Sequence, residues 1–285
     1  MNSNLDLYFK TARERYTMLL RRRSGEHTGP PWTDDPVLAK NRFCNVFRED
    51  DRTTVWLREN VRDPMCSEPG VLFGIALVRF FNRIETAEIL VNHELHRFWN
   101  PTEAERLLRD VSPIVGGAYV VHTPNNQGLN KLQGVVSMLN AVWADWPAAE
   151  QAICQSASME AAVDYLVRYP SVGKFVAYQL AADLRFTWVL DNASDILTWA
   201  QLGPGSSKGL GWIYYDDPTR FSYTSKRDVA DAQQLMRNLL AASNDPDYWS
   251  PSWPRWDMQA VQNWLCEFSK YKAGLRGERL KRRYP

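Results

Sequence analysis

Apolar residues recur at helical spacing along most of this sequence, and that pattern limits the possible fold more than any other feature. From Lys131 to Trp146, leucine, valine and tryptophan return every three or four residues, which predicts an amphipathic helix that Pro147 ends. Strand-like runs are short and confined to Ala118–His122 and Trp212–Tyr215. The helical pattern returns in three further segments: 101–108, 229–242 and 258–271. The sequence therefore predicts a mostly α protein with a few short strands, folded as a single domain over residues 1–285.

The composition excludes several classes of protein. With 45% hydrophobic and 24% charged residues, the chain has enough apolar surface to bury, so wholesale disorder is excluded. A mean hydropathy of −0.43 argues against a transmembrane helix, and the first residues do not resemble a signal peptide. The four cysteines are widely separated, and His93 and His96 lack the neighbours of a zinc site. We expect a soluble cytoplasmic protein with reduced thiols and no metal site.

Charge is distributed unevenly along the chain, although 34 basic and 33 acidic residues give a net charge of only +1. Residues 1–62 carry 12 basic and 9 acidic side chains, and residues 270–285 carry seven basic and one acidic side chain. The remainder is therefore acidic. A chain polarised in this way can present a basic face to a nucleic acid. The basic charge of residues 270–285 is explained equally well by a tail that is exposed to solvent and binds nothing.

The most informative motif spans residues 159–184. A predicted helix over 159–168 is followed by a short turn with Gly173 and by a second helix that begins at Lys174, as in a helix-hairpin-helix element. We expect Gly173 to permit a turn that a side chain would block. The amides at the start of the second helix, with Lys174 beside them, would bind a DNA phosphate. An ordinary helical hairpin with a glycine turn is the alternative.

Two further features follow the hairpin. Asp191 and Asp195 lie 18 and 22 residues beyond the hairpin glycine, a separation similar to that of the catalytic aspartate in helix-hairpin-helix DNA glycosylases. Either carboxylate is therefore a candidate for the mouth of a base pocket. The glycine-rich segment that comes next, with Gly203, Gly205 and Lys208, is predicted to be a loop whose backbone amides bind an anion. The pattern GxxxxGK[ST] does not occur, which excludes a P-loop.

Two arginine-rich segments, residues 41–52 and 79–83, combine guanidinium and amide groups with aromatic rings. Because Arg79 lies at the end of the most apolar predicted helix, its charge needs an anion or a carboxylate nearby. Arg48 and Arg52 could form ion pairs with the acidic residues 49–51. The alternative is an aromatic pocket that binds a flipped base carrying phosphates. The polar members of the two segments are Arg42, Asn45, Arg48, Arg52, Arg79, Asn82 and Arg83.

The order of these motifs resembles that of the phage α-glutamyl/putrescinyl-thymine pyrophosphorylases, also described as amino acid:DNA transferases. The same pattern is found in the helical domain attached to phage 5-hydroxymethyluracil DNA kinases. Because the sequence shows no kinase module, the free-standing transferase is the better match. The similar segments extend from about residue 13 to the end of the chain: 31–36, 41–52, 80–85, 117–121, 172–184, 202–210 and 265–271.

The resemblance implies a helix-hairpin-helix, DNA-glycosylase-like fold and a step in thymidine hypermodification. A hydroxymethyluracil DNA kinase pyrophosphorylates the modified thymidine in double-stranded DNA. The transferase then replaces the pyrophosphate with an amine from an amino acid or a polyamine, in the cytoplasm of the infected bacterium. This scheme requires no metal or organic cofactor and no membrane.

The resemblance also assigns roles to residues of this chain. Asp191 or Asp195 is expected to take the proton from the amine. Ser269 stands where relatives are expected to carry an acidic residue. The expected pyrophosphate- and substrate-binding residues are Arg42, Asn45, Arg48, Arg52, Arg79, Asn82, Arg83, Lys208, Glu267 and Lys270. The expected DNA-binding residues are Gly173, Lys174, Gly203 and Gly205, and the expected stacking rings are Phe43, Phe80 and Trp212.

Two other functions fit the same residues. A glycosylase that removes a modified base would share the fold and the aspartate. A non-catalytic module that delivers DNA to the kinase would need the hairpin and the basic tail but not the arginines.

Overall fold

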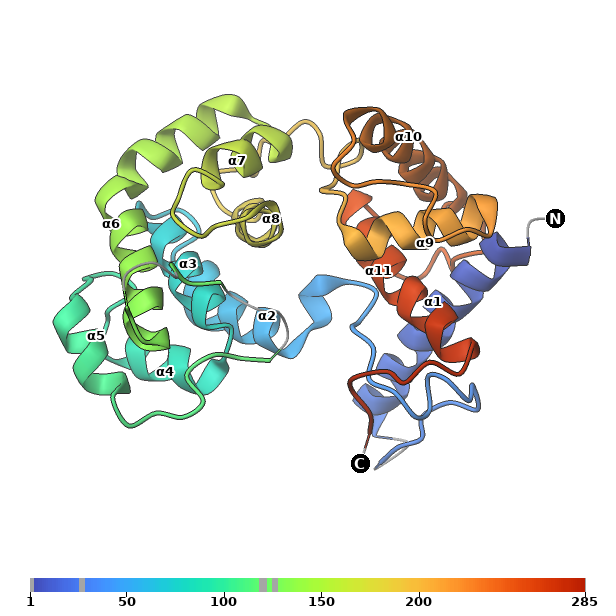
Figure 1. Ribbon diagram of the computed structural model, residues 1–285, viewed down its shortest axis with the longest axis horizontal. Coiled ribbons are helices and arrows are strands. Elements are labelled where there is room, and N and C mark those ends of the chain that lie inside the picture. The colour runs from blue at the N-terminus through green and yellow to red at the C-terminus, as the bar shows by residue number, and fades with distance from the viewer. Residues whose placement is uncertain (1–2, 26–28, 118–121, 125–127, 285) are drawn as a thin grey trace. The chain divides into compact units, whose positions relative to one another are not determined.

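The computed structural model describes residues 3–25, 29–117, 122–124 and 128–284, and nearly all of their regular structure is helical. These residues gather into two compact units, which are described separately below. Unit 1 combines residues 1–51 with 196–285, the blue and the orange-to-red parts of Figure 1, and unit 2 comprises residues 52–195. The prediction of a mostly α protein is confirmed. The single domain and the glycosylase-like fold remain predictions.

Unit 1 is held together by helix packing around buried aromatic rings. The indole of Trp264 donates a hydrogen bond to the carbonyl of Tyr8 (3.0 Å), and the ring of Tyr8 lies 5.5 Å from that of Phe268 in an edge-on contact. These contacts join the first helix of the chain to the last. The unit contains α1 (Ser3–Ser24), the short 3-10 helix η1 (Arg48–Asp50), α9 (Pro204–Tyr215), α10 (Lys226–Ala242) and α11 (Met258–Leu275).

Unit 2 is built around α3 (Val71–Phe81), every residue of which is buried. Helices α6 (Lys131–Ser156) and α8 (Lys174–Leu184) pack on it, which explains why its sequence is apolar on all sides. The other helices of the unit are α2 (Arg52–Leu57), the π-helical turn η2 (Arg58–Arg62), α4 (Ile84–Asn92), α5 (Pro101–Leu108) and α7 (Met159–Leu166).

The predicted end of a helix at Pro147 is wrong, because α6 continues through this proline to Ser156. Tertiary contacts hold the second half of the helix in place. The buried carboxylate of Glu150 accepts hydrogen bonds from the backbone N–H groups of Gly70 and Leu72 (2.9 Å each), at the start of α3. These bonds and the burial of the following apolar residues outweigh the helix penalty of a proline, which is about 3 kcal/mol.

The predicted strands are also corrected. Residues 212–215 form the last turn of α9 and not a strand, and residues 118–121 lie outside the described part of the chain. Within the described ranges, strand pairing is limited to one antiparallel bridge between Asn41 and Arg283. None of the described helices is long and apolar enough to cross a membrane. All four cysteines are free thiols.

Candidate active site

Charged and amide side chains from three distant parts of the chain meet in unit 1. We call this group the polar cluster. Most of its members are buried, although charged groups are rarely buried without a partner or a function. The cluster consists of Arg15 from α1, Asn45, Arg48 and Asp51 from the segment that follows, and Glu267 and Lys270 from α11.

Asn45 and Asp51 form the first half of the polar cluster. The Oδ1 atom of Asp51 accepts hydrogen bonds from the backbone N–H of Asn45 (3.2 Å) and from its Nδ2 (3.0 Å). The side chain of Asn263 on α11 donates to the carbonyl oxygens of Asn45 (2.7 Å) and Val46 (3.0 Å). The segment is thereby folded on itself and fixed to the last helix.

Glu267 and Lys270 form the second half. The Oε2 atom of Glu267 accepts the backbone N–H of Cys44 (2.9 Å) and lies 2.6 Å from the Nζ atom of Lys270. Burial alone would lower the pKa of Lys270, but the neighbouring Glu267 outweighs this effect and raises the pKa above its usual value. Lys270 therefore remains a cation, available to an anion because its side chain is 45% exposed.

The two carboxylates of the polar cluster lie in different environments. Burial raises the pKa of Asp51 to about 6, and the negative charge of Glu267 adds to this effect. The N–H groups of Asn45 and the guanidinium groups of Arg15 and Arg48 act in the opposite direction. A carboxylate whose pKa is raised by burial and that has charged partners beside it is typical of acid–base sites.

The polar cluster also contains buried polar atoms without partners. Arg15 donates from Nε (3.3 Å) and Nη2 (3.2 Å) to the carbonyl of Phe43. Its Nη1 atom and the Oδ1 atom of Asn45 have no hydrogen-bond partner among the described residues. Leaving such an atom buried and unpaired costs about 1–3 kcal/mol, so groups of this kind tend to be retained for a function.

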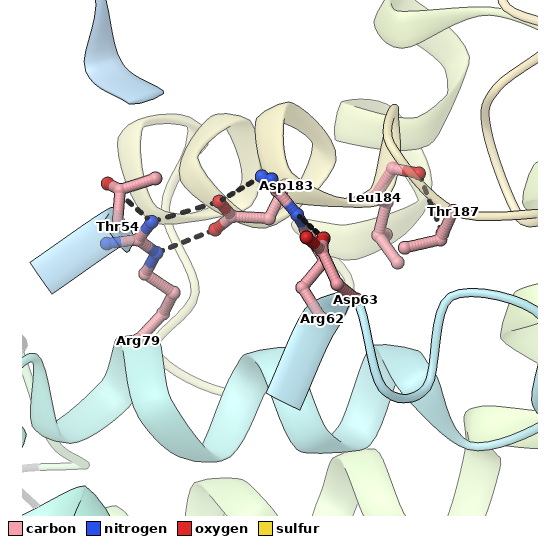
Figure 2. Close-up of polar contacts among 7 residues, drawn as sticks. All are labelled: Thr54, Arg62, Asp63, Arg79, Asp183, Leu184 and Thr187. Atoms are coloured by element: carbon pink, nitrogen blue, oxygen red, sulfur yellow. Dashed lines mark hydrogen bonds and ion pairs between the residues drawn. The ribbon is translucent and has the colours of Figure 1, made fainter. Parts of the chain in front are cut away.

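Arg79, in unit 2, meets a carboxylate as its burial requires. Its Nε and Nη2 atoms lie 2.6 and 2.9 Å from the two oxygens of Asp183 on α8, and Nη2 also donates to Thr54 (3.0 Å). Arg62 lies 4.0 Å from the same carboxylate. Figure 2 shows how Arg62 and Arg79 approach Asp183. No sequence motif singles out Asp183, which is completely buried. This geometry gives Arg79 a structural partner inside the unit.

The predicted hairpin has its two helices, α7 and α8, and the second begins at Lys174 as expected. The predicted role of the glycine in the turn is wrong. Gly173 has an extended backbone with φ −82°, and a Cβ atom added there would meet nothing within 4 Å. The left-handed residue of the turn is Ser171, with φ 61°. Lys174 and Phe175 are both exposed at the start of α8, so a phosphate can approach these amides.

The two aspartates after the hairpin are placed differently. Asp195 accepts hydrogen bonds from Ser158 Oγ (2.8 Å) and from the backbone N–H groups of Met159 (2.7 Å) and Glu160 (3.1 Å). It thereby caps the start of α7, which stabilises that helix. Asp191 is exposed to solvent.

The glycine-rich segment is helix and not the predicted anion-binding loop. Its N–H at Gly203 donates to Ser206 Oγ (2.9 Å), and α9 begins at the next residue. The later glycines allow α9 to approach α11: a Cβ atom on Gly205 would lie 3.0 Å from the sulfur of Cys266. Lys208 is exposed on the same helix.

The remaining predicted residues divide between the two units. In unit 1, the guanidinium of Arg42 lies 5.6 Å from the ring centre of Tyr284. In unit 2, Arg52 is exposed at the start of α2, and Arg83 forms an ion pair with Glu85 (3.2 Å). Asn82 is buried at the end of α3 with φ 45°. Of the ten predicted substrate-binding residues, the structure brings Asn45, Arg48, Glu267 and Lys270 together.

The predicted stacking rings are mostly inaccessible. Phe80 is completely buried in α3, and Phe43 is 7% exposed, so neither can stack on an extruded base in this conformation. Trp212 is half-buried, with the cations of Lys272 and Arg276 over its ring at 4.7 and 5.4 Å.

The basic tail is docked on unit 1 and is not a freely solvated end. Backbone hydrogen bonds join Arg42 N–H to the carbonyl of Arg282 (3.0 Å) and Tyr284 N–H to the carbonyl of Lys40 (3.2 Å). The exposed cations of the tail are therefore held in place. They lie on the more basic unit, since unit 1 carries 22 basic and 17 acidic residues, and unit 2 carries 12 and 16.

Comparison with known proteins identifies the family. The model of the helical domain of 5-hmdU (5-hydroxymethyldeoxyuridine) DNA kinases matches residues 2–278. The chain belongs to this family. A 5-hmdU DNA kinase of Bacillus phage SP10 is 26% identical over 288 residues, which cover 93% of this chain and 44% of the relative. The chain thus spans less than half the length of that kinase. No solved structure matches it.

The family assignment confirms the resemblance to the helical domain of hydroxymethyluracil DNA kinases that the sequence motifs indicated. Among the residues that the structure describes, no group of three or more histidine, cysteine, aspartate or glutamate side chains is placed to hold a metal ion. The polar cluster is the candidate site of this chain, because it combines cations, an amide and two carboxylates in one place.

Proposed function

We propose that this chain modifies thymine in phage DNA by replacing the pyrophosphate of 5-pyrophosphomethyl-deoxyuridine with an amine. The amine of an amino acid or a polyamine forms a C–N bond with the exocyclic methylene carbon. The bond between that carbon and the pyrophosphate oxygen breaks, and pyrophosphate leaves with the electron pair. One proton of the amine passes to a carboxylate.

The polar cluster is the observation that carries this proposal. It brings Arg48 and Lys270 beside Glu267 and Asp51. The hydrogen bond from the backbone N–H of Cys44 to Glu267, which joins the two halves, links residues that are 223 positions apart in the chain. Cations are needed to neutralise the leaving pyrophosphate, and carboxylates are needed to receive the proton. Asp191 and Asp195 are the bases expected from the sequence, and separate replacement of each by asparagine tests that expectation.

Pyrophosphate release measures this activity directly. We expect the chain to release inorganic pyrophosphate from DNA containing 5-pyrophosphomethyl-deoxyuridine only when an equimolar mixture of amino acids and putrescine is present. Lys270→Met should slow this release about 100-fold, because it removes a cation from the site of the leaving group. Lys226→Met, the same change on the exposed start of α10, is the matched control. Equal rates for the two variants would contradict the role of Lys270.

DNA binding is proposed to use the backbone amides at Gly173 and Lys174 and, in unit 1, the docked basic tail. Lys174→Ala should weaken binding to duplexes of any sequence to a similar degree. It should also lower the slope of log affinity against log salt by about 1, since one phosphate contact is lost. Fluorescence anisotropy at several salt concentrations measures both effects. An unchanged slope would exclude Lys174 as a phosphate contact.

A second function is a non-catalytic module that delivers DNA to a hydroxymethyluracil DNA kinase. The observation in its favour is the family assignment. The relative is a kinase, and the match to this chain covers 44% of its length. Such a module would bind the same DNA but would release no pyrophosphate. A functional link to this kinase, in the cytoplasm of the infected bacterium, is proposed in both cases.

A further inference from the structure

We infer that Asp51 is the proton acceptor for the attacking amine, in place of Asp191 and Asp195. This inference rests on the proposed transfer reaction and names a catalytic residue of the polar cluster. The carboxylate of Asp51 takes a proton from the ammonium form of the donor, the free amine then forms the C–N bond, and the second proton of that nitrogen passes to solvent. Pyrophosphate departs with the electrons of the broken C–O bond.

The geometry leaves one oxygen of Asp51 available. Its Oδ1 atom accepts both hydrogen bonds from Asn45, which fix the carboxylate in orientation. Both of these hydrogen bonds end on Oδ1, and the side chain is only half-buried, which leaves Oδ2 for a substrate. An oriented carboxylate with one available oxygen is what a general base requires.

The neighbours of Asp51 fit the same role. Arg15, on α1, and Arg48 are positive groups that keep the carboxylate partly ionised, while Glu267 on α11 raises its proton affinity. Lys270 is held by Glu267 at 2.6 Å, and the Cys44 thiol faces Asp51, Glu267 and Lys270. Tyr284 and Arg22 lie near Arg15, and the Cys266 thiol lies near Glu267. A base of raised proton affinity that is still ionised at neutral pH is suited to receive a proton from an ammonium group.

The earlier candidates fit less well. Both oxygens of Asp195 are occupied by the three donors at the start of α7, so this carboxylate already has a structural role. Asp191 is exposed at the surface of unit 2.

Asp51→Asn tests the inference, because the new amide keeps an oxygen that can accept both hydrogen bonds from Asn45. We expect kcat/KM for transfer at pH 7 to fall by about 10²–10³-fold. The deficit should shrink as the pH approaches 9–10, since an amine that is already unprotonated needs no base. A merely structural role would lower the rate by the same factor at every pH. Asp50→Asn, the same change at the neighbouring residue, should leave the rate nearly unchanged.

The rates are measured as pyrophosphate release from DNA containing 5-pyrophosphomethyl-deoxyuridine, with the amino acid and putrescine mixture as donor. Thermal melting checks that both variants are folded. A rate for Asp51→Asn within threefold of the wild-type rate, or a deficit independent of pH, would overturn the role of Asp51 while the proposed function stands. If the wild-type chain binds this DNA but transfers no amine at any pH, the proposed function itself fails.

Discussion

Replacing Asp183 with alanine should lower the free energy of unfolding of unit 2 by about 3–5 kcal/mol, the range measured when one partner of a buried ion pair is removed. Asp183 is completely buried, and Arg79 and Arg62 are 3% and 2% exposed. Without the carboxylate, two buried guanidinium groups lose their shared negative partner (Figure 2). Because Asp183 lies on α8 and Arg79 on α3, the loss should separate the hairpin from the core of the unit.

Urea denaturation followed by circular dichroism measures this effect. Glu103→Ala is the control, because it breaks an exposed ion pair with Arg106 on the surface of the same unit. We expect the control to melt at the same urea concentration as the wild type. A loss below about 1 kcal/mol for Asp183→Ala would show that the buried pair does not hold the unit together.

Replacing Gly209 with alanine should destabilise unit 1 by about 2–3 kcal/mol through overpacking. The new Cβ atom would lie 2.3 Å from the carbonyl oxygen of Leu265 and 3.1 Å from its Cα atom, both backbone atoms of α11. Neither helix backbone can give way locally, so α9 and α11 must move apart. The gain in helix propensity, about 1 kcal/mol for this change, does not offset the clash.

Gly173→Ala is the contrasting variant. Its backbone conformation suits any residue, and the added Cβ atom meets nothing within 4 Å, so the melting temperature should not fall. The two variants separate a glycine required for helix packing from one at the proposed phosphate site. Thermal melting of both proteins measures this difference. Equal melting temperatures would contradict the close approach of α9 and α11.

Features that depend on local sequence were predictable. The start of α8 at Lys174 follows from the turn before it, and the start of α6 at Lys131 is supported by Asn130, which caps the helix together with Gln133. The continuation of α6 through Pro147 was not predictable, because it depends on contacts between Glu150 and residues about 80 positions away. Local propensity cannot show such contacts.

The candidate site was predictable only in part, for the same reason. Asn45 and Arg48 could be selected by residue type, and Glu267 and Lys270 through the resemblance to the family. Their assembly with Arg15 could not, because it requires α1 and α11 to pack together. The environment of Asp51 is set by burial, which a sequence pattern does not reveal. The prediction of an anion-binding loop after the hairpin is wrong because close helix packing and anion binding both favour glycine.

Nucleoside mass spectrometry tests the central claim most directly. DNA containing 5-pyrophosphomethyl-deoxyuridine is incubated with this chain and the mixture of amino acids and putrescine, then digested to nucleosides. The proposed transferase predicts a nucleoside that has lost pyrophosphate and gained one amine, and the mass gained names the donor. Unchanged nucleosides with intact DNA binding would contradict the transfer reaction and favour the DNA-delivering module, and abasic sites would favour a glycosylase.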